Sequence, residues 1–470
     1  SARPWELNKT ETIDIMDAMG SNIRIDSKGL RVMRVLPRLN EDINEEWITD
    51  KTRFFCDGLN NQRIDKPYKR VDGILKPTSW KNALELAKEK ISNSNSEKIS
   101  ALSGDLVDIE TVYALKKLMN SIGSENFDCR QDGSRISGPP ERWLFNSTFN
   151  GIEDSDGCLI IGSDIRKEAP LLNSRLLRKS RDDEYKIGVI GFNNDLTFDF
   201  DFLGENSSIV EDILNENNNF CDDLSSMKKP LMILGQGALI GKDAQNFQNI
   251  CIEIAYKFNF INNDWNGFNV LHSAASRAGA MSIGFFPSDK GMITEEIISS
   301  YNDKKLDLLY LLGADELNLE KNDDCFVIYQ GHHGDIGAQI ADLVFPAAAF
   351  CEQNGLYMNT EGRVQESIRS TFPLGEAKEN WEIIYLLAKE MSFDIGFSNL
   401  NELRNQLIEE FPIINPYREF EPLPSPKKDE FEKLNGHQFK RIIDSYWQTN
   451  SIARASSNLS IRNNYIKEEN

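Results

Sequence analysis

Short runs of consecutive apolar residues recur along the middle of the chain, and most end in glycine or an acidic residue. Residues 158–161 and 308–312 are examples. Between such runs, apolar residues recur at helical spacing, as in 80–92 and 109–122. Uninterrupted apolar strands that alternate with helices are typical of parallel sheets buried on both faces. The pattern therefore predicts an α/β fold with doubly wound parallel sheets.

The repeating unit occurs over two stretches, 158–192 and 230–350, so we expect two such sheets. The first 70 residues differ, because 23–29 and 32–35 alternate in polarity around a glycine turn and predict a small β unit. The chain thus divides into three expected regions: 1–72, a small β unit; 73–375, the α/β region of two interleaved subdomains; and 376–470, helices, a proline-rich linker and a tail.

The C-terminal region lacks the strand pattern. Five prolines between Pro412 and Pro426 predict an extended linker over residues 412–430, lying on a surface. The segment from Ser451 onward is too polar to form its own core. We expect it to pack on a neighbour or to fray.

The formal charge of −21 changes the picture of possible partners. It argues against nucleic acid, which requires a basic face, and against an anionic lipid surface. The longest apolar runs fall far short of the roughly 20 residues of a spanning helix, so we expect no direct membrane insertion.

The seven cysteines are scattered, and no two lie closer than 26 residues. No C-x2-C pair occurs, and the four histidines are too few to complete a metal site. This spacing predicts reduced core thiols and no metal site.

The sequence gives only weak signals for a ligand-binding or catalytic site among its other residues. The strand-end glycines favour tight turns over a ligand site, since none forms a clear G-x-G-x-x-G that opens a helix. His332 and His333, followed by Asp335, should point in opposite directions and pack a tight loop with ring nitrogens bonded to backbone. Glu361 and Arg363 are interpreted as a buried ion pair that fixes a turn. We expect no catalytic residue.

Residues 329–350, followed by 359–365, resemble the molybdopterin-oxidoreductase family. The opening segment 21–54 resembles in detail the family of 75 kDa-type large peripheral-arm subunits of respiratory complex I, and the resemblance covers nearly the whole chain. It implies a molybdopterin-oxidoreductase-like fold whose active site has been lost.

In active molybdoenzymes, the opening unit carries a C-x2-C-x3-C triplet and a fourth cysteine that hold a [4Fe-4S] cluster. The resemblance puts Asp14, Asp17, Ser21 and Thr49 at these vestigial positions. Carboxylates and hydroxyls do not hold iron–sulfur clusters, so we expect no cluster here. Lys51 falls where the family has a lysine between cluster and pterin, and a structural or solvent role is expected.

The molybdenum ligand of active members would fall near residues 128–137, where Ser134 and Cys129 are the only plausible donors. The local sequence does not match an active-site motif. Two alternatives stay open: an active molybdenum or tungsten oxidoreductase, which requires the missing cysteines, and a free-standing α/β small-molecule binder that uses the strand-end glycines.

The resemblance implies a structural subunit of NADH:ubiquinone oxidoreductase, without a cofactor of its own, that supports the iron–sulfur electron-transfer chain. The family's Arg-Pro-Trp-Glu sequence follows its cluster-bearing region and stands here at residues 3–6. We therefore expect the [2Fe-2S] and [4Fe-4S] clusters on a separate N-terminal iron–sulfur half, with other peripheral-arm subunits as partners. Many Asn, Ile and Lys residues suggest an AT-rich genome, hence the matrix side of the mitochondrial inner membrane, with a bacterial membrane as the alternative.

Overall fold

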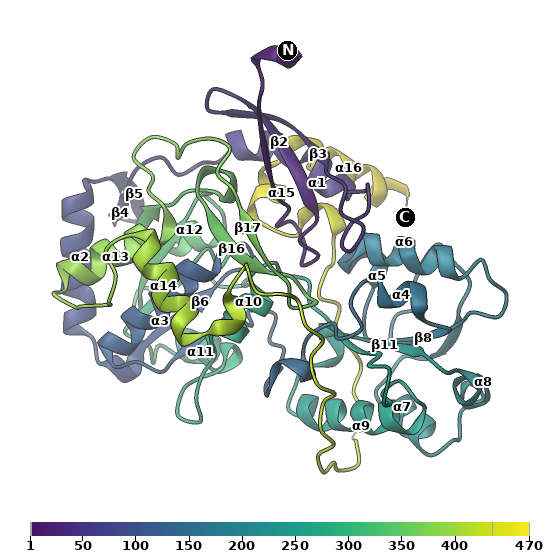
Figure 1. The fold of residues 1–470 in the computed structure, drawn as a ribbon. Helices are drawn as coiled ribbons and strands as arrows, with labels where there is room; N and C mark the ends of the chain where they lie inside the picture. The colour runs from purple at the N-terminus through teal and green to yellow at the C-terminus, as the bar shows by residue number, and fades with distance from the viewer. Residues whose placement is uncertain (1, 435, 470) are drawn as a thin grey trace.

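The computed structural model describes residues 2–434 and 436–469. It contains an N-terminal sheet, two α/β lobes that lie side by side, and a C-terminal tail that runs between them (Figure 1). No helix within the described residues is long and apolar enough to cross a membrane.

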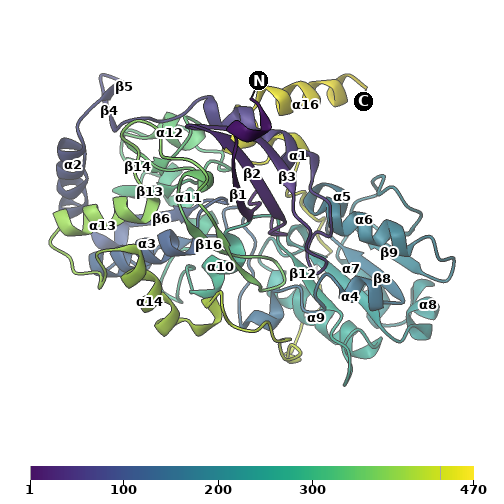
Figure 2. The same ribbon diagram turned by 45° about the horizontal axis from the view of Figure 1, so that its top comes forward.

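The N-terminal sheet is the small β unit expected from the alternating pattern. Its three antiparallel strands are β1 (Asn8–Ile13), β2 (Asn22–Lys28) and β3 (Arg31–Pro37). Figure 2 shows these strands at the front of the molecule. Two short helices follow, α1 (Asp50–Phe54) and the 3-10 helix η2 (Phe55–Asn60).

The large lobe surrounds a seven-stranded sheet of order β5-β4-β15-β14-β13-β6-β7. Its strands β13 and β6 are buried throughout, as their apolar runs predict. The strands are β4 (Tyr68–Val71), β5 (Ile74–Pro77), β6 (Ile99–Ser103), β7 (Phe127–Asp128), β13 (Leu308–Leu312), β14 (Phe326–Gly331) and β15 (Leu343–Pro346).

The helices of the large lobe begin at residues that cap them. Ser79 accepts a hydrogen bond from the Asn82 amide, and Asp108 accepts one from the Thr111 amide, which satisfies amides that have no partner inside the helix. The helices are α2 (Trp80–Asn93), α3 (Ile109–Ile122), α10 (Arg277–Ser282), α11 (Thr294–Asn302), α12 (Ile336–Ile340), α13 (Asn380–Glu390) and α14 (Leu400–Glu410).

The small lobe surrounds a wholly parallel sheet of order β10-β9-β8-β11-β12. Its strands are β8 (Gly157–Ile161), β9 (Lys186–Ile190), β10 (Asp201–Gly204), β11 (Pro230–Gly235) and β12 (Phe268–Leu271). Its helices are α4 (Gly151–Asp154), α5 (Ile165–Glu168), α6 (Pro170–Lys179), α7 (Ser208–Leu214), α8 (Phe220–Ser226) and α9 (Ala244–Lys257).

Two expected doubly wound sheets are therefore confirmed, but their division along the chain was wrong. Residues 230–271 do not begin the second sheet, since β11 pairs with β8 and β12 and completes the small lobe. The expected boundary at residue 72 also separates two paired strands, because β4 and β5 form a hairpin at the edge of the large sheet. Local apolar runs predict strands, whereas only pairing decides which sheet each strand joins.

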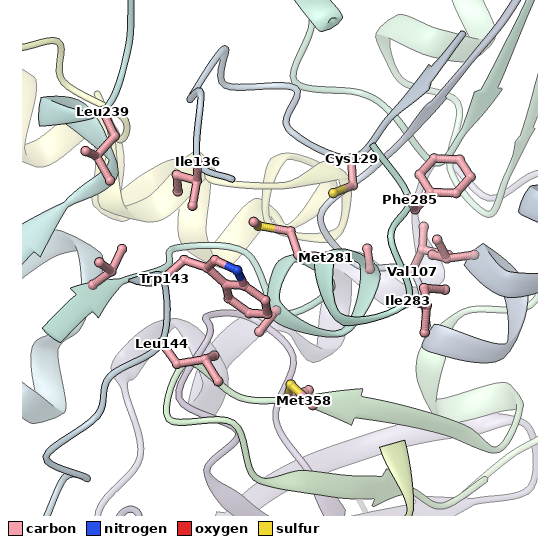
Figure 3. Packing of buried hydrophobic residues seen from close by; sticks show 14 of the residues in the cluster. Val107, Cys129, Ile136, Trp143, Leu144, Leu239, Met281, Ile283, Phe285 and Met358 are labelled. Atoms are coloured by element: carbon pink, nitrogen blue, oxygen red, sulfur yellow. The ribbon is translucent and has the colours of Figure 1, made fainter. Parts of the chain in front are cut away.

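The two lobes share one hydrophobic core. Figure 3 shows Trp143 beside Met281 of α10 in the large lobe, and Leu239, which follows β11 of the small lobe, belongs to the same cluster. Met358 joins this core from the hairpin of β16 (Gly355–Met358) and β17 (Val364–Ser367). A continuous core of this kind resists separation of the lobes.

The tail follows the surface and then enters the core. The linker was expected over residues 412–430, but Pro412–Ile414 form the 3-10 helix η7 and Ile414 is fully buried. The extended segment begins after Ile414: the described residues between 415 and 445 form no helix or strand, and Tyr256 of α9 donates to the Pro426 carbonyl at 2.9 Å. The expectation that residues beyond Ser451 pack on a neighbour or fray was wrong. Helix α15 (Ser451–Ala455) is buried, and α16 (Ser457–Glu469) places Leu459 in the core of the N-terminal sheet.

Candidate functional site

The four residues that the resemblance puts at cluster positions come together at one buried place. The Asp14 amide donates to the Ser21 carbonyl at 2.8 Å and closes the loop that joins β1 to β2. Thr52 donates from its hydroxyl to Asp14 Oδ2 at 2.6 Å, and its oxygen lies 2.8 Å from the Thr49 hydroxyl. We call this group the Asp14–Asp17 site; all of its members are buried, and they are Asp14, Asp17, Ser21, Thr49, Lys51 and Thr52.

Local sequence explains this geometry. Asp14 and Asp17 each accept from the amide two residues later, Met16 and Met19, as short acidic side chains do in turns. Thr49 caps α1 through the Thr52 amide, which brings α1 against the loop. These bonds hold the turn but leave the carboxylates inside the protein.

The electrostatics of the Asp14–Asp17 site follow from burial. Desolvation, with the nearby charge of Asp17, raises the pKa of Asp14 to about 7. Desolvation also raises the pKa of Asp17, although Lys51 opposes the shift. The pKa of Lys51 is lowered by the same burial, against the attraction of both carboxylates.

Lys51 is 2% exposed. Of the two roles expected for it, a structural role fits this burial, whereas a role as a solvated surface residue does not. Its Nζ donates to Thr449 Oγ1 at 3.0 Å and lies 5.4 Å from the centre of the Tyr446 ring. Lys51 therefore joins the first unit of the chain to the tail.

The residues at this site do not fit an iron–sulfur cluster. Thiolates are the ligands that such clusters require, and the site offers carboxylate and hydroxyl oxygens. Cys56 is the one cysteine near it in sequence, and burial raises the pKa of its thiol to about 12. A single cysteine cannot supply the four thiolates that hold such a cluster.

A cavity of about 580 Å³ adjoins the site, between the two lobes. It lies at the carboxyl ends of parallel strands, where α/β folds bind ligands. Asp105 follows β6, Asp315 and Glu316 follow β13, and Ser273 follows β12, while residues 440–450 of the tail close the other side. The volume is that of an ordinary small-molecule site.

Carboxylates and their own cations occupy the walls of this cavity. Arg277 pairs with Asp132 at 3.1 Å, and Arg454 pairs with Glu316 at 2.8 Å. Gln131 donates from Nε2 to both Asp105 and Glu316, at 2.7 and 2.9 Å. Burial and the neighbouring Asp105 raise the pKa of Glu316 to about 8.

A pterin dinucleotide does not fit such walls. Its phosphates require basic and amide donors. The arginines of the lining are already near carboxylates, since Arg454 pairs with Glu316 and Arg441 lies 3.4 Å from Asp164, and Arg277 pairs with the lining residue Asp132. The strand-end amides are also used internally, since Gly104 donates to the Leu312 carbonyl at 2.8 Å and Gly313 to the Gln330 carbonyl at 2.7 Å.

The strand-end glycines serve close packing. A Cβ atom on Gly104 would lie 1.8 Å from the Gly313 carbonyl oxygen, and one on Gly162 would lie 2.6 Å from the Ala238 Cβ. Tight strand-end turns, the interpretation favoured from the sequence, account for these residues.

The two candidate molybdenum donors do not fit a metal either. Ser134 accepts a hydrogen bond from Arg277 Nη1 at 3.1 Å, so its oxygen faces a cation. Cys129 is buried in the hydrophobic core, and this burial raises the pKa of its thiol to about 12.

His332 and His333 do not point in opposite directions, and this expectation was wrong. Their Nδ1 atoms are hydrogen-bonded to each other, because the chain turns sharply after β14. A ring nitrogen bonded to backbone, as expected, is found for His333, whose Nε2 contacts the Gly58 carbonyl at 2.8 Å, whereas His332 Nδ1 bonds to the His333 ring. Arg363 and the buried Glu361 form the expected ion pair at 2.9 Å.

Sequence patterns did not reveal the acid–amide arrangement of Asp105, Gln131 and Glu316. The pairs lie 26 and 185 positions apart, and no short motif marks them. The acidic residues that end the apolar runs were a usable signal, because the carboxyl ends of neighbouring parallel strands meet at one edge. The prediction of core thiols is confirmed: six of the seven cysteines are buried, and Cys56 is half-buried.

Comparison with known proteins gives two family matches. Residues 63–390 match the molybdopterin oxidoreductase family, and residues 7–57 match the NADH-ubiquinone oxidoreductase NDSU1/NuoG-like 4Fe-4S domain. The second match covers the Asp14–Asp17 site, whose donors are oxygens.

Curated relatives are similar over 97% of this chain. The NADH-quinone oxidoreductase G subunit of Rickettsia bellii is 40% identical, and 65% of its length is covered. The mitochondrial NADH-ubiquinone oxidoreductase 78 kDa subunits of Neurospora crassa and Candida albicans are each 39% identical, with 62% and 64% of their lengths covered. The chain thus spans less than two thirds of these relatives.

Proposed function

Because this chain belongs to the molybdopterin oxidoreductase family and is a homologue of a complex I subunit, we propose that it is a structural subunit of the complex I peripheral arm. In this role it carries no redox cofactor and no catalytic residue. It holds neighbouring subunits so that the iron–sulfur centres stay within electron-transfer distance. The NADH:ubiquinone oxidoreductase activity belongs to the whole complex.

One observation carries the proposal. The place that the 4Fe-4S family model covers is closed by Asp14, Asp17, Ser21 and Thr49, whose side chains are buried and offer oxygen donors. A neutral, buried thiol at Cys129 and paired arginines at the cavity argue in the same direction.

The partners follow from the relatives. More than a third of each relative's length has no counterpart in this chain. We propose that the [2Fe-2S] and [4Fe-4S] clusters of the complex lie beside residues 1–72 and that other peripheral-arm subunits dock on this chain. The proposed location is the matrix side of the mitochondrial inner membrane. Similarity to bacterial subunits keeps a bacterial membrane as the alternative.

A native gel of gently solubilised membranes, followed by mass spectrometry of the band that contains this chain, tests the proposal. We expect co-migration with flavin and iron–sulfur subunits in a band that oxidises NADH. Migration of the chain alone, or in an assembly without those subunits, would contradict it. Iron and acid-labile sulfide analysis of the purified chain tests the lack of a cluster separately.

The cavity of about 580 Å³ favours a second candidate, a small-molecule-binding protein. Native mass spectrometry of the purified chain, compared with the mass after denaturation, tests this function. A retained organic molecule of defined mass supports it, and equal masses exclude it for the purified protein.

A further inference from the structure

Two oxygen atoms of the Asp14–Asp17 site have no hydrogen-bond partner in the described part of the chain. They are Asp17 Oδ2 and Ser21 Oγ. Both residues are almost fully buried, at 2% and 1% exposure. A buried carboxylate oxygen or hydroxyl that has lost its hydration without a replacement is rare in folded proteins, and such atoms point to an ion or molecule that contacts them.

The charges at the site do not balance. Two carboxylates, Asp14 and Asp17, share the field of a single ammonium, Lys51, which also faces Asp105. The Lys51 Nζ donates a hydrogen bond to Thr449 rather than to either carboxylate. With both carboxylates ionised, the site is short of one positive charge, and buried uncompensated charge is strongly unfavourable.

The donor atoms select the kind of cation that can supply this charge. Carboxylate and hydroxyl oxygens are hard ligands, which favour alkali and alkaline-earth ions over soft metals. Asp14 keeps acceptor capacity, since each of its oxygens accepts one hydrogen bond, from the Met16 amide and from the Thr52 hydroxyl, and has a further lone pair. A single charge restores neutrality, whereas a divalent ion would leave an excess.

We propose that the Asp14–Asp17 site binds one hard monovalent cation, Na⁺ or K⁺, through Asp17 Oδ2, Ser21 Oγ and the Asp14 carboxylate. The ion lies where the family model covers a 4Fe-4S domain, so an oxygen-ligated cation takes the place of a thiolate-ligated cluster. Met16, whose amide donates to Asp14, and Lys51 also line the adjoining cavity, so the site lies next to it. Binding of the ion does not require membership in complex I.

Thermal unfolding of the purified full chain in chloride salts of equal ionic strength is the first test. The salts are KCl, NaCl and choline chloride, and choline is too large for the site. We expect a midpoint several degrees higher in KCl or NaCl, with saturation as the ion concentration rises, because a ligand that binds only the folded state stabilises it. Equal midpoints in all three salts would overturn the proposal.

Two matched serine variants test whether the Ser21 hydroxyl is a ligand of the cation or only an unpaired buried hydroxyl. Ser21→Ala removes a proposed ligand. The Na⁺ or K⁺ concentration that gives half of the maximal stabilisation should therefore rise about tenfold, or the stabilisation should disappear. Ser27→Ala is the control, because the buried Ser27 hydroxyl donates to the Ser370 carbonyl at 2.9 Å and should lose stability equally in every salt. If Ser21→Ala is more stable than the native chain in all three salts alike, Ser21 was an unpaired hydroxyl and the site holds no cation.

A crystallographic measurement on the native chain does not depend on any variant folding. Crystals grown in KCl and transferred to RbCl should give an anomalous peak within coordination distance of Asp17 Oδ2. Absence of a peak there, with ordered density for Asp14 and Asp17, would mean that a proton on a carboxyl balances the charge instead. That outcome would overturn the cation site and leave the proposed function untouched.

Discussion

The Nζ atom of Lys51 lies 3.0 Å from Oγ1 of Thr449, so a residue of the opening unit and a residue of the tail meet beside two buried carboxylates. The contact spans 398 positions of the chain. It makes the Asp14–Asp17 site, the cavity and the tail one structural unit rather than three.

Replacing Lys51 with methionine should strongly destabilise the protein. Methionine keeps the apolar stem but removes the ammonium that faces Asp14 and Asp17, and a buried charge without its partner costs about 3–5 kcal/mol. Urea unfolding measures the change. Lys81→Met, at an exposed lysine of α2, is the control and should change the free energy of unfolding by less than about 0.5 kcal/mol. A Lys51 variant as stable as the control would contradict a role for its charge.

The Glu316→Gln variant should gain stability relative to the native chain as the pH rises. The folded pKa of Glu316, about 8, lies above its ordinary value of 4.5, so the folded state holds a proton that the unfolded state has released. The contribution of Glu316 is fully present below pH 4.5 and is lost as the pH rises to 8. The stability difference should grow by at most about 1.4 kcal/mol per pH unit between these values. Unfolding at pH 5, 6.5 and 8 measures it, with the exposed Glu46→Gln as a control that should show a flat difference.

Arg454→Ala should release the tail from the cavity. Arg454 contacts Asp335 at 2.6 Å and Glu316 at 2.8 Å, so its removal leaves two largely buried carboxylates without that cation. We expect a loss of about 3 kcal/mol or more and faster proteolytic cleavage between residues 440 and 450. Limited proteolysis with mass mapping tests it. Arg418→Ala, at an arginine of the extended linker, should leave both quantities nearly unchanged.

Gly104→Ala should prevent normal packing of the large sheet. The added Cβ atom would meet the Gly313 carbonyl oxygen at 1.8 Å, and backbone on both sides has no room to move. The expected loss is about 3 kcal/mol or more, or a failure to accumulate folded protein. At Gly334, a Cβ atom would meet the Gln62 carbonyl oxygen only at 3.6 Å. Gly334→Ala should therefore be tolerated, and equal behaviour of the two variants in thermal unfolding would refute the packing argument.

The sequence predicted the buried strands, which a local apolar pattern determines. It did not predict which sheet each strand joins, because that depends on pairing between distant segments. The apolar runs at 308–312 and 158–161 gave the buried strands because burial on both faces requires uninterrupted apolar residues. The same pattern could not assign residues 230–271 to the small lobe, since the order of strands depends on contacts between distant segments.

The sequence likewise indicated some residues of the candidate site and missed others. The family resemblance singled out Asp14, Asp17, Ser21 and Thr49, and these residues lie together in the structure, where they offer oxygen donors in place of thiolates. It could not reveal Glu316, whose position beside Asp105 arises from the meeting of two strand ends. The low apolar content of the tail also led to a wrong expectation, because a few apolar residues such as Ile452 and Leu459 are enough to anchor it in a core.

The core beneath the N-terminal sheet contains Ile13 and Ile25 from the start of the chain and Trp447, Ile452 and Leu459 from its end. During synthesis, the ribosome releases the β1–β3 segment long before those partners emerge. The apolar face of this sheet is therefore covered only after residues 447–459 have been translated, so the first strands of the chain complete their core late in synthesis.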